Sequence, residues 1–266
     1  MTQHPPTYPP THITRNNTGA VLQMQFTTRV EVINSMFLDN SNQAKVEPDV
    51  NETTVEELFG AITTGGAFTY FSRNEQFIDV TIKNCTFRSN TGNRNDVNNS
   101  RPVLLKANGH GGAILIRLAN VTDSVFTIED CLFENNQAEV DGGGVFISIS
   151  NGVSSNWINF RNNTFINNVV ETASGGAVSL NSFNITFNNV IIIEDCDFIN
   201  NHGNAGGAFS VALYDSNINS TTQQDAVNFT RCNFIDNTAF NEGTAVGLFS
   251  LVHVDQVGFP VSFSDW

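Results

Sequence analysis

Short runs in which apolar and polar residues alternate recur along most of the chain. Examples are the segments VTI (80–82), FTI (126–128) and VNF (227–229). Alternation with β-branched and aromatic residues is typical of strands, and no segment sustains the 3.6-residue period of a helix. The pattern therefore predicts an all-β protein built from short strands.

Six of these runs lead into a common block with the form Phe-X-X-Asn. The blocks are NSMFLDN (34–40), NCTFRSN (84–90), DCLFENN (130–136), NNTFINN (162–168), DCDFINN (195–201) and RCNFIDN (231–237). Their phenylalanines are Phe37, Phe87, Phe133, Phe165, Phe198 and Phe234. Self-similarity in a fixed order is the signature of a solenoid.

A second, glycine-rich block follows each Phe block. It reads GGAF from Gly65, GGAI from Gly111, GGVF from Gly143, GGAV from Gly175, GGAF from Gly206 and a degraded EGTAV from Glu242. The distance from the glycine pair to the next Phe is nearly constant, whereas the distance from the Phe to the glycine pair is much longer in the first two repeats. One side of each repeat is therefore held to length, and the other accepts insertions.

The glycine pairs predict turns, because glycine adopts backbone conformations that other residues rarely take. Each repeat then supplies about three short strands separated by turns. Stacked in register at about 4.8 Å, such repeats form a parallel β-helix of about six coils, with the Phe residues as an internal ladder. Hairpin signals such as Asn-Gly at short spacing, which a sandwich needs, are scarce.

The paired Phe-X-X-Asn and Gly-Gly-Ala-(Ile/Leu/Val) motifs resemble the repeat of the chlamydial-type polymorphic outer membrane proteins. The resemblance covers about residues 30 to 250 and implies a right-handed parallel β-helix of the pectin-lyase-like class. It also resembles regions of large eukaryotic surface proteins. It implies a module flanked by further domains in a longer chain.

Three regions are expected. Residues 1–25 are predicted to be irregular or disordered, because Pro5, Pro6, Pro9 and Pro10 exclude regular pairing. Residues 26–255 are predicted to form the β-helix, and residues 256–266 a C-terminal tail.

Charge excludes one class of partner. The formal net charge is −14 with only 12 Lys and Arg residues, which argues against binding nucleic acid through its phosphates. No apolar run approaches the ~18 residues that span a bilayer, so we expect no direct membrane insertion, and the first residues show no apolar signal segment.

Sequons point to export. Asn-X-Ser/Thr occurs nine times, and Asn51, Asn98 and Asn219 are the candidate glycosylation sites. Because roughly one residue in seven is Asn, chance also generates sequons. The prediction is an extracellular or cell-surface location.

Four cysteines occupy one slot, two residues before the Phe: Cys85, Cys131, Cys196 and Cys232. Neighbouring coils would place Cys85 beside Cys131 and Cys196 beside Cys232, at a spacing that a disulfide allows but with poor torsion. Stacked, buried, free thiols are the preferred interpretation. No metal ligand set and no cofactor motif is visible, so no cofactor is expected.

A catalytic site is not apparent. His110 lies in Gly-His-Gly, which resembles a polygalacturonase motif, but the clustered Asp residues of those enzymes are missing, and a loop histidine is the preferred interpretation. Asp123, Glu139 and Asp141 are scattered singly along the chain. No nucleophile with an oriented base can be assembled, so no catalytic residue is predicted.

Residues 41–64 and 91–110 lengthen the same interval in the first two coils, so we expect them to emerge side by side from one face. Loops on a rigid scaffold commonly carry binding. The candidate binding residues are Glu47, Asp49, Glu56, Arg94, Arg101 and His110. Length drift between repeats, with the two loops pairing only with each other, is the alternative.

The sequence favours a non-enzymatic extracellular module for adhesion or spacing, with a protein or glycan ligand at the cell surface. A polysaccharide lyase or hydrolase is the alternative. Convergence of carboxylates with an Arg or Lys on one sheet face would distinguish the enzyme.

Overall fold

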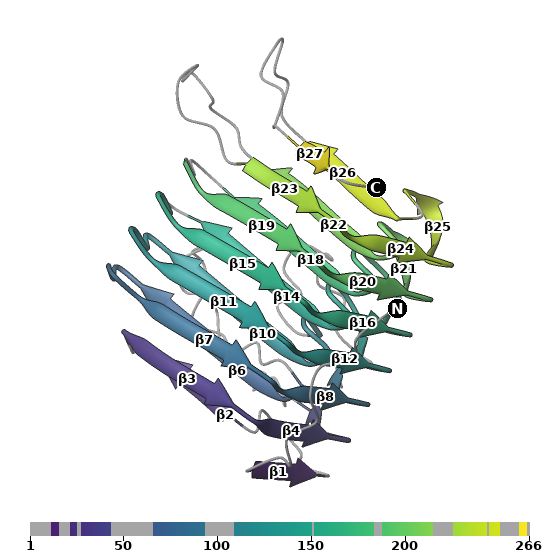
Figure 1. Ribbon diagram of the computed structural model, residues 1–266, viewed down its shortest axis with the longest axis horizontal. Helices are drawn as coiled ribbons and strands as arrows, with labels where there is room; N and C mark the ends of the chain where they lie inside the picture. The colour runs from purple at the N-terminus through teal and green to yellow at the C-terminus, as the bar shows by residue number, and fades with distance from the viewer. Residues whose placement is uncertain are drawn as a thin grey trace, which may run out of the picture.

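The computed structural model describes residues 12–15, 22–25, 28–43, 66–93, 109–150, 152–183, 188–214, 226–243, 245–250 and 261–264. Its strands form four sheets, and every strand pair within them is parallel. Successive strands of the chain go to different sheets, so each repeat makes one coil of a rod (Figure 1). The predicted parallel β-helix is confirmed.

Sheets A and B carry the short strands. Sheet A holds the Phe blocks, in the order β1 (His12–Arg15), β4 (Ser35–Leu38), β8 (Thr86–Arg88), β12 (Leu132–Glu134), β16 (Thr164–Ile166), β20 (Asp197–Ile199) and β24 (Asn233–Ile235). Sheet B follows it in each coil, with β5 (Ser41–Gln43), β9 (Thr91–Asn93), β13 (Gln137–Ala138), β17 (Val169–Val170), β21 (His202–Ala205) and β25 (Thr238–Glu242).

Sheets C and D carry the longer strands. Sheet C starts after each glycine pair and contains β2 (Leu22–Gln25), β6 (Phe68–Arg73), β10 (Ile114–Ala119), β14 (Val145–Ser150), β18 (Val178–Phe183), β22 (Phe209–Tyr214) and β26 (Val246–Ser250). Sheet D contains β3 (Arg29–Ile33), β7 (Asp79–Lys83), β11 (Val125–Glu129), β15 (Trp157–Arg161), β19 (Val190–Glu194), β23 (Ala226–Thr230) and β27 (Val261–Ser264).

Each coil therefore has four strands, where the sequence predicted about three. The additional strand is the one in sheet B, directly after the Asn of the Phe block. In the third and fourth coils it is only two residues long, as in β13 and β17. Alternation cannot be recognised over two residues, so this strand left no pattern in the sequence.

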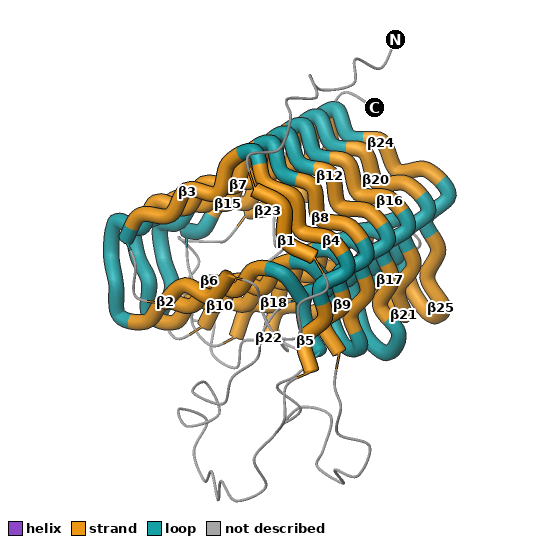
Figure 2. The backbone as a smooth tube through the Cα atoms, turned by 90° about the horizontal axis from the view of Figure 1, so that it is seen from below, coloured by secondary structure: helices purple, strands orange, loops and turns teal. Residues whose placement is uncertain are grey.

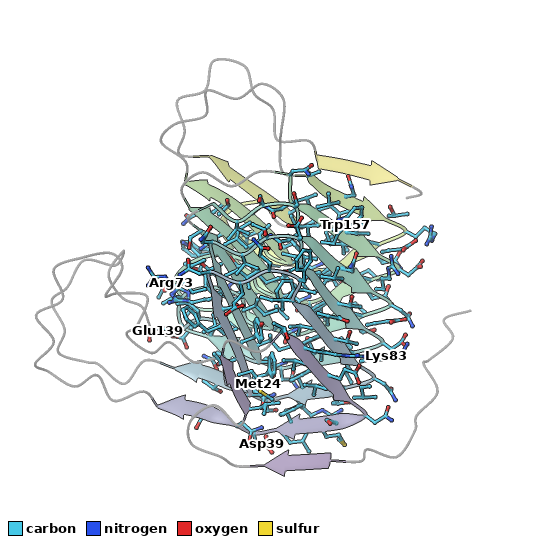
Figure 3. All side chains as sticks on the ribbon, turned by 90° about the vertical axis from the view of Figure 1, so that its left-hand side faces the viewer. Met24, Asp39, Arg73, Lys83, Glu139 and Trp157 are labelled. Carbon is cyan, nitrogen blue, oxygen red and sulfur yellow. The ribbon has the colours of Figure 1, made fainter. Side chains whose placement is uncertain are left out.

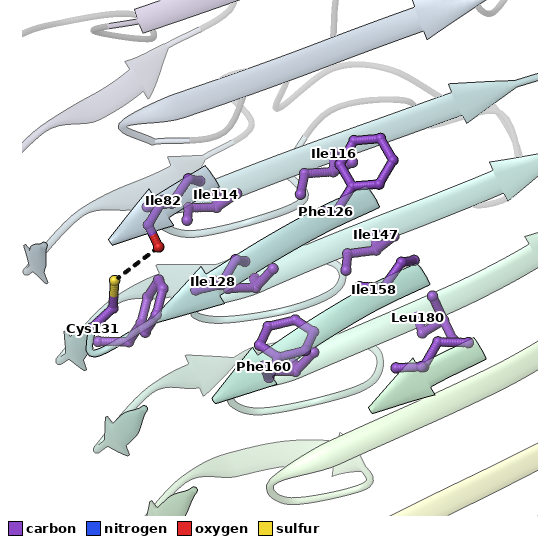
Figure 4. Packing of buried hydrophobic residues seen from close by; sticks show 14 of the residues in the cluster. Ile82, Ile114, Ile116, Phe126, Ile128, Cys131, Ile147, Ile158, Phe160 and Leu180 are labelled. Atoms are coloured by element: carbon purple, nitrogen blue, oxygen red, sulfur yellow. Dashed lines mark hydrogen bonds between the residues drawn. The ribbon is translucent and has the colours of Figure 1, made fainter. Parts of the chain in front are cut away.

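Sheets C and D face each other, and sheets A and B close the other end of the cross-section (Figure 2). The alternating residues of the two long sheets point between them and are nearly fully buried. Figure 4 shows Ile116 and Ile147 of sheet C against Phe126 and Ile158 of sheet D. This layer is the main core.

The six block phenylalanines form a continuous stack along the inside of sheet A. Consecutive ring centroids lie 4.8, 5.0, 4.6, 5.0 and 4.9 Å apart from Phe37 to Phe234, with nearly parallel planes. The centroid spacing matches the distance between neighbouring strands. The stack is therefore a direct product of the coil register.

The Asn of each block forms a second ladder, buried beside the phenylalanines. In Asn168 the side-chain Nδ2 donates to the Phe133 carbonyl at 3.0 Å and to Asn201 Oδ1 at 2.9 Å, and the backbone N–H donates to the same oxygen at 2.9 Å. The same contacts recur from Asn90 to Asn201. Each buried amide thus has partners in the coils on both sides.

Left-handed backbone accounts for much of the remaining Asn and Asp. The residue before the Cys slot and the residue before the ladder Asn have positive φ in every coil, for example Asn162 (φ 50) and Asn167 (φ 53). Asn and Asp tolerate this region better than other non-glycine residues. The Phe block itself therefore contains the residues that turn the chain on both sides of each sheet A strand.

The glycine pairs serve two different needs. Gly175 has φ +73, and a Cβ on Gly176 would lie 2.1 Å from the Gly207 carbonyl oxygen of the next coil. The first glycine is required by its backbone conformation and the second by close packing between coils. The predicted turns lie between sheets B and C.

The alignment on Gly143 was wrong by one residue. Ile114 pairs with Val145, so Gly142 is the partner of Gly111, and Gly143 is the second glycine of its pair. Three consecutive glycines made the register ambiguous in the sequence. As a result Phe146 corresponds to Leu115 and points away from the core.

The four cysteines are free and buried. Each thiol lies near the carbonyl two residues earlier, as Cys131 Sγ does at 3.1 Å from the Glu129 oxygen. Ser35 makes the same contact through its hydroxyl. Burial raises the pKa of Cys131 and Cys196 well above the ordinary thiol value. The slot selects a small side chain that can donate to this carbonyl.

The sheets extend past the expected region boundaries. Within residues 1–25 the structure describes β1 and β2, which pair with β4 and β6, and within residues 256–266 it describes β27, which pairs with β23.

Replacing Phe165 with Ala is expected to lower the free energy of unfolding by about 3 to 5 kcal/mol. The ring is fully buried and stacks against Phe133 and Phe198. Denaturant unfolding followed by circular dichroism measures the effect. A loss below about 1 kcal/mol would show that the ladder contributes little.

Replacing Asn168 with Leu is expected to destabilise the protein by about 3 kcal/mol or more. The change leaves the Phe133 carbonyl, the Asn136 donors and Asn201 Oδ1 without one partner each, and a buried unpaired group costs about 1 to 3 kcal/mol. The control is Asn233→Ala, an exposed residue with one side-chain bond to Asp197. Equal effects of the two changes would contradict the ladder's importance.

The thiols are expected to resist labelling in the folded protein. A raised pKa keeps Cys131 and Cys196 protonated at pH 8, and the thiolate is the reactive form. The hydrogen bond with the neighbouring thiol lowers the pKa of Cys85 and Cys232, so these two are protected by their burial alone. Ellman's reagent should react with all four thiols in denaturant and slowly without it. Prompt reaction of the native protein would refute the buried slot.

Candidate functional site

The outward side of sheet C is buried, unlike that of sheet D. Thr69, Leu115 and Ser179 point away from the core and are 3%, 0% and 0% exposed. On sheet D the outward residues Val125 and Trp157 are 39% and 49% exposed. Figure 3 shows Trp157 on the side of the rod opposite Glu139. The two faces of the rod therefore differ in kind.

A histidine–carboxylate pair lies at the edge of this buried side. His110 Nδ1 is 3.2 Å from Asp141 Oδ2, and both side chains are 11% exposed. Asp141 is held by two further contacts: its Oδ1 accepts from the Ser174 backbone N–H at 3.1 Å, and its Oδ2 accepts from Asn181 Nδ2 at 3.4 Å. The carboxylate therefore has contacts in the coils on both sides of its own.

The repeat places this pair. His110, Asp141 and Ser174 each come directly before the first glycine of their pair in three successive coils. Residues in one slot of neighbouring coils are neighbours in space. An alignment of the repeats with Gly142 as the first glycine places His110 and Asp141 in the same slot of neighbouring coils. The alignment on Gly143 hid this signal.

Phe146 packs beneath His110. The ring centroids are 4.5 Å apart with an interplanar angle of 20°. Phe146 occupies the outward slot that Leu115 and Ser179 fill in the neighbouring coils, and it is 2% exposed. The imidazole thus has an aromatic ring on one face and a carboxylate at its edge.

Arg117 on β10 lies on the same side of sheet C. It pairs in register with Ser148, which pairs with Asn181, so the three outward side chains form one row across neighbouring strands. Burial lowers the pKa of Arg117 to about 10, which still leaves the guanidinium charged at neutral pH. Its Nε is buried without a hydrogen-bond partner.

Other buried polar atoms around this side also lack partners in the described part of the chain. They are His110 Nδ1, Glu139 Oε2 and Ser210 Oγ. The imidazole nitrogen is close to Asp141 but not aligned for a hydrogen bond. Glu139 Oε2 lies against Gly109, 3.5 Å from where a Cβ would be. We call His110, Arg117, Glu139, Asp141, Phe146, Ser148 and Asn181 the sheet C site.

The sheet C site brings His110 and Asp141 into contact and places Arg117 on the same side of the sheet, whereas the sequence treated these residues as unrelated. Among the described residues no group of three or more His, Cys, Asp or Glu side chains is arranged to hold a metal ion. The side chains of the site can accept and donate hydrogen bonds and can pair with a charged group on a ligand.

The other predicted binding residues lie outside the described residues. These are Glu47, Asp49, Glu56, Arg94 and Arg101, and the sequons at Asn51, Asn98 and Asn219. Of the candidate binding residues, the structure describes His110.

The attachment points of the two insertions are described. Gln43 ends β5 and pairs with Asn93 at the end of β9. The chain is described again from Gly66 and from Gly109, and the Gly66 N–H donates to the Gly111 carbonyl. Residues 44–65 and 94–108 are therefore anchored at neighbouring positions of sheets B and C.

Charged side chains at two corners next to sheet D form ion pairs with side chains of neighbouring coils. Lys83 lies 3.2 Å from Glu129, and Arg231 lies 2.7 Å from Asp195 in a neighbouring coil. Such exposed pairs contribute little to stability.

Comparison with known proteins gives one partial relative. In the described part of the chain no helix is long and apolar enough to cross a bilayer. No protein-family profile matches the chain, and no solved structure matches it. The chain is similar to the probable autotransporter YfaL of Escherichia coli strain K12, with 26% identity over 151 residues. The matched region is 57% of this chain and 11% of that protein.

Proposed function

We propose that the chain is an extracellular β-helix module of the autotransporter-passenger type. The partial similarity to a probable autotransporter and the four parallel sheets support this. We also propose that the repeat is of the polymorphic outer membrane protein class and that the sequons are glycosylated.

Within that class we infer a non-enzymatic role in adhesion or spacing. The observation that carries it is the placement of the two insertions. They leave from paired residues, Gln43 and Asn93, on a rod in which buried ladders connect consecutive coils. A protein or glycan at the cell surface is the proposed partner of the insertions.

A polysaccharide-acting enzyme is the second candidate. The sheet C site favours it, because Asp141 contacts His110 and Asn181, and Asn181 lies in one row with Arg117 on the same side of the sheet. An arrangement of this kind is what such an enzyme needs. Product formation from polysaccharides, lost in an Asp141→Asn variant, would establish this candidate.

Removing both insertions tests the adhesion role. The register makes Asn93 the counterpart of Glu139 and Gly109 the counterpart of Val140, so residues 94–108 can be deleted without a shift. Deleting residues 44–62 joins Gln43 to Thr63 and keeps the same count before Gly66. Circular dichroism should remain that of a β-protein, because every strand of the described residues is kept.

The shortened protein is expected to lose binding to the cell-surface or glycan ligand that the intact protein selects on an array. A variant with only residues 94–108 deleted separates the two loops. Unchanged affinity after both deletions would contradict the proposal that the insertions form the binding surface.

A further inference from the structure

We propose that the sheet C site binds a small ligand that carries a carboxylate beside hydroxyl groups. The inference does not depend on the insertions or on the adhesion role, since the residues that carry it lie in β10, β14, β18 and the adjoining turns. It assigns recognition, and not catalysis, to these residues.

Arg117 requires an anionic group on the ligand. Within the described residues it has no ion pair, and its Nε is buried without an acceptor. Among the described residues, the ion-paired arginines Arg29, Arg88, Arg161 and Arg231 each lie within 3.6 Å of a carboxylate oxygen. A planar guanidinium matches a carboxylate through two parallel hydrogen bonds. The Arg117 side chain as a whole is half-buried, while its Nε is fully buried.

The acidic side chains of the site require hydrogen-bond donors on the ligand. Asp141 is anchored by Ser174 and Asn181, and Glu139 Oε2 is buried without a partner. Ionised carboxylates only accept hydrogen bonds, so a ligand that satisfies them must bring N–H or O–H groups. A simple anion would satisfy Arg117 and be repelled by these acids. A hydroxy-carboxylate offers a carboxylate to Arg117 and hydroxyl donors to the acids.

The row geometry sets the size of the ligand. Arg117, Ser148 and Asn181 occupy one row on three neighbouring strands. At about 4.8 Å per strand, the first and third backbones are about 10 Å apart. Asp141 contacts the Asn181 end of the row, and the arginine stands at the other. A ligand that contacts both ends of the row has to span a comparable distance.

Neutral groups line the middle of the row. Ser148 is 4% exposed, and its hydroxyl lies between the two charged ends. Phe146 and His110 stack next to it and form a flat wall. The wall restricts the ligand to a chain or ring that lies along the row.

The test compares gluconate with sorbitol by isothermal titration calorimetry on the full chain. The two probes have the same carbon skeleton length and differ in the carboxylate. We expect gluconate to bind and sorbitol to bind at least about tenfold more weakly, since a charge-assisted bidentate pair is the stronger kind of hydrogen bond. Equal binding of both, or no binding of gluconate, would overturn the proposal.

Two variants assign the contacts. Arg117→Gln should weaken gluconate binding at least about tenfold, whereas Arg88→Gln, which removes the same charge from an exposed pair with Glu134, should leave it unchanged. Asp141→Asn should reduce the preference for gluconate over acetate. Equal effects of the two arginine changes would mean that net charge, and not the site, controls binding.

Folding and function are kept apart by a third variant. Arg117→Lys keeps the charge but loses the planar fork, so it should fold and bind gluconate with intermediate affinity. Circular dichroism and the Tm of each variant report the fold. Gluconate binding that survives deletion of residues 44–62 and 94–108 supports the sheet C site even if the adhesion proposal fails; loss of gluconate binding from that folded protein contradicts it.

Discussion

The rod depends on one constraint, the exchange of hydrogen bonds between equivalent residues of neighbouring coils. Each backbone group that a coil presents along the rod axis needs a partner one strand spacing away. The buried Asn ladder extends this rule to side chains, because Asn136, Asn168 and Asn201 each bond to the next coil in the same way. Any residue change that shifts one coil therefore unpairs groups in two others.

This constraint explains why variation is confined to particular places. The corners on both sides of sheet A keep their length and their Asn or Asp residues in most coils, while the connection between sheets B and C varies most and the one between sheets C and D lengthens after β22. The sheet C site lies beside that variable connection, on the side of the rod where the outward residues are buried. Sheet D, with its paired charges such as Arg231 and Asp195, carries the regular exposed face.

Most of the fold could be predicted from the repeat, because spacing between Phe and glycine blocks reports the coil directly. The strand in sheet B could not, since two residues such as Val169 and Val170 show no alternation. The sheet C site was missed for a different reason. His110 and Asp141 are 31 positions apart and meet only when coils are aligned to the residue, and the three glycines before Val145 obscured that alignment.

The register at the second insertion has a consequence for chain entropy. Asn93 and Gly109 lie opposite Glu139 and Val140, which are joined by a single peptide bond. The ends of the loop are thus already brought together by the sheets, so the entropy of closing it grows only with the logarithm of its length. A loop of very different length can replace this one at little cost in stability. Sequence and length can therefore vary at this position while the rod stays the same.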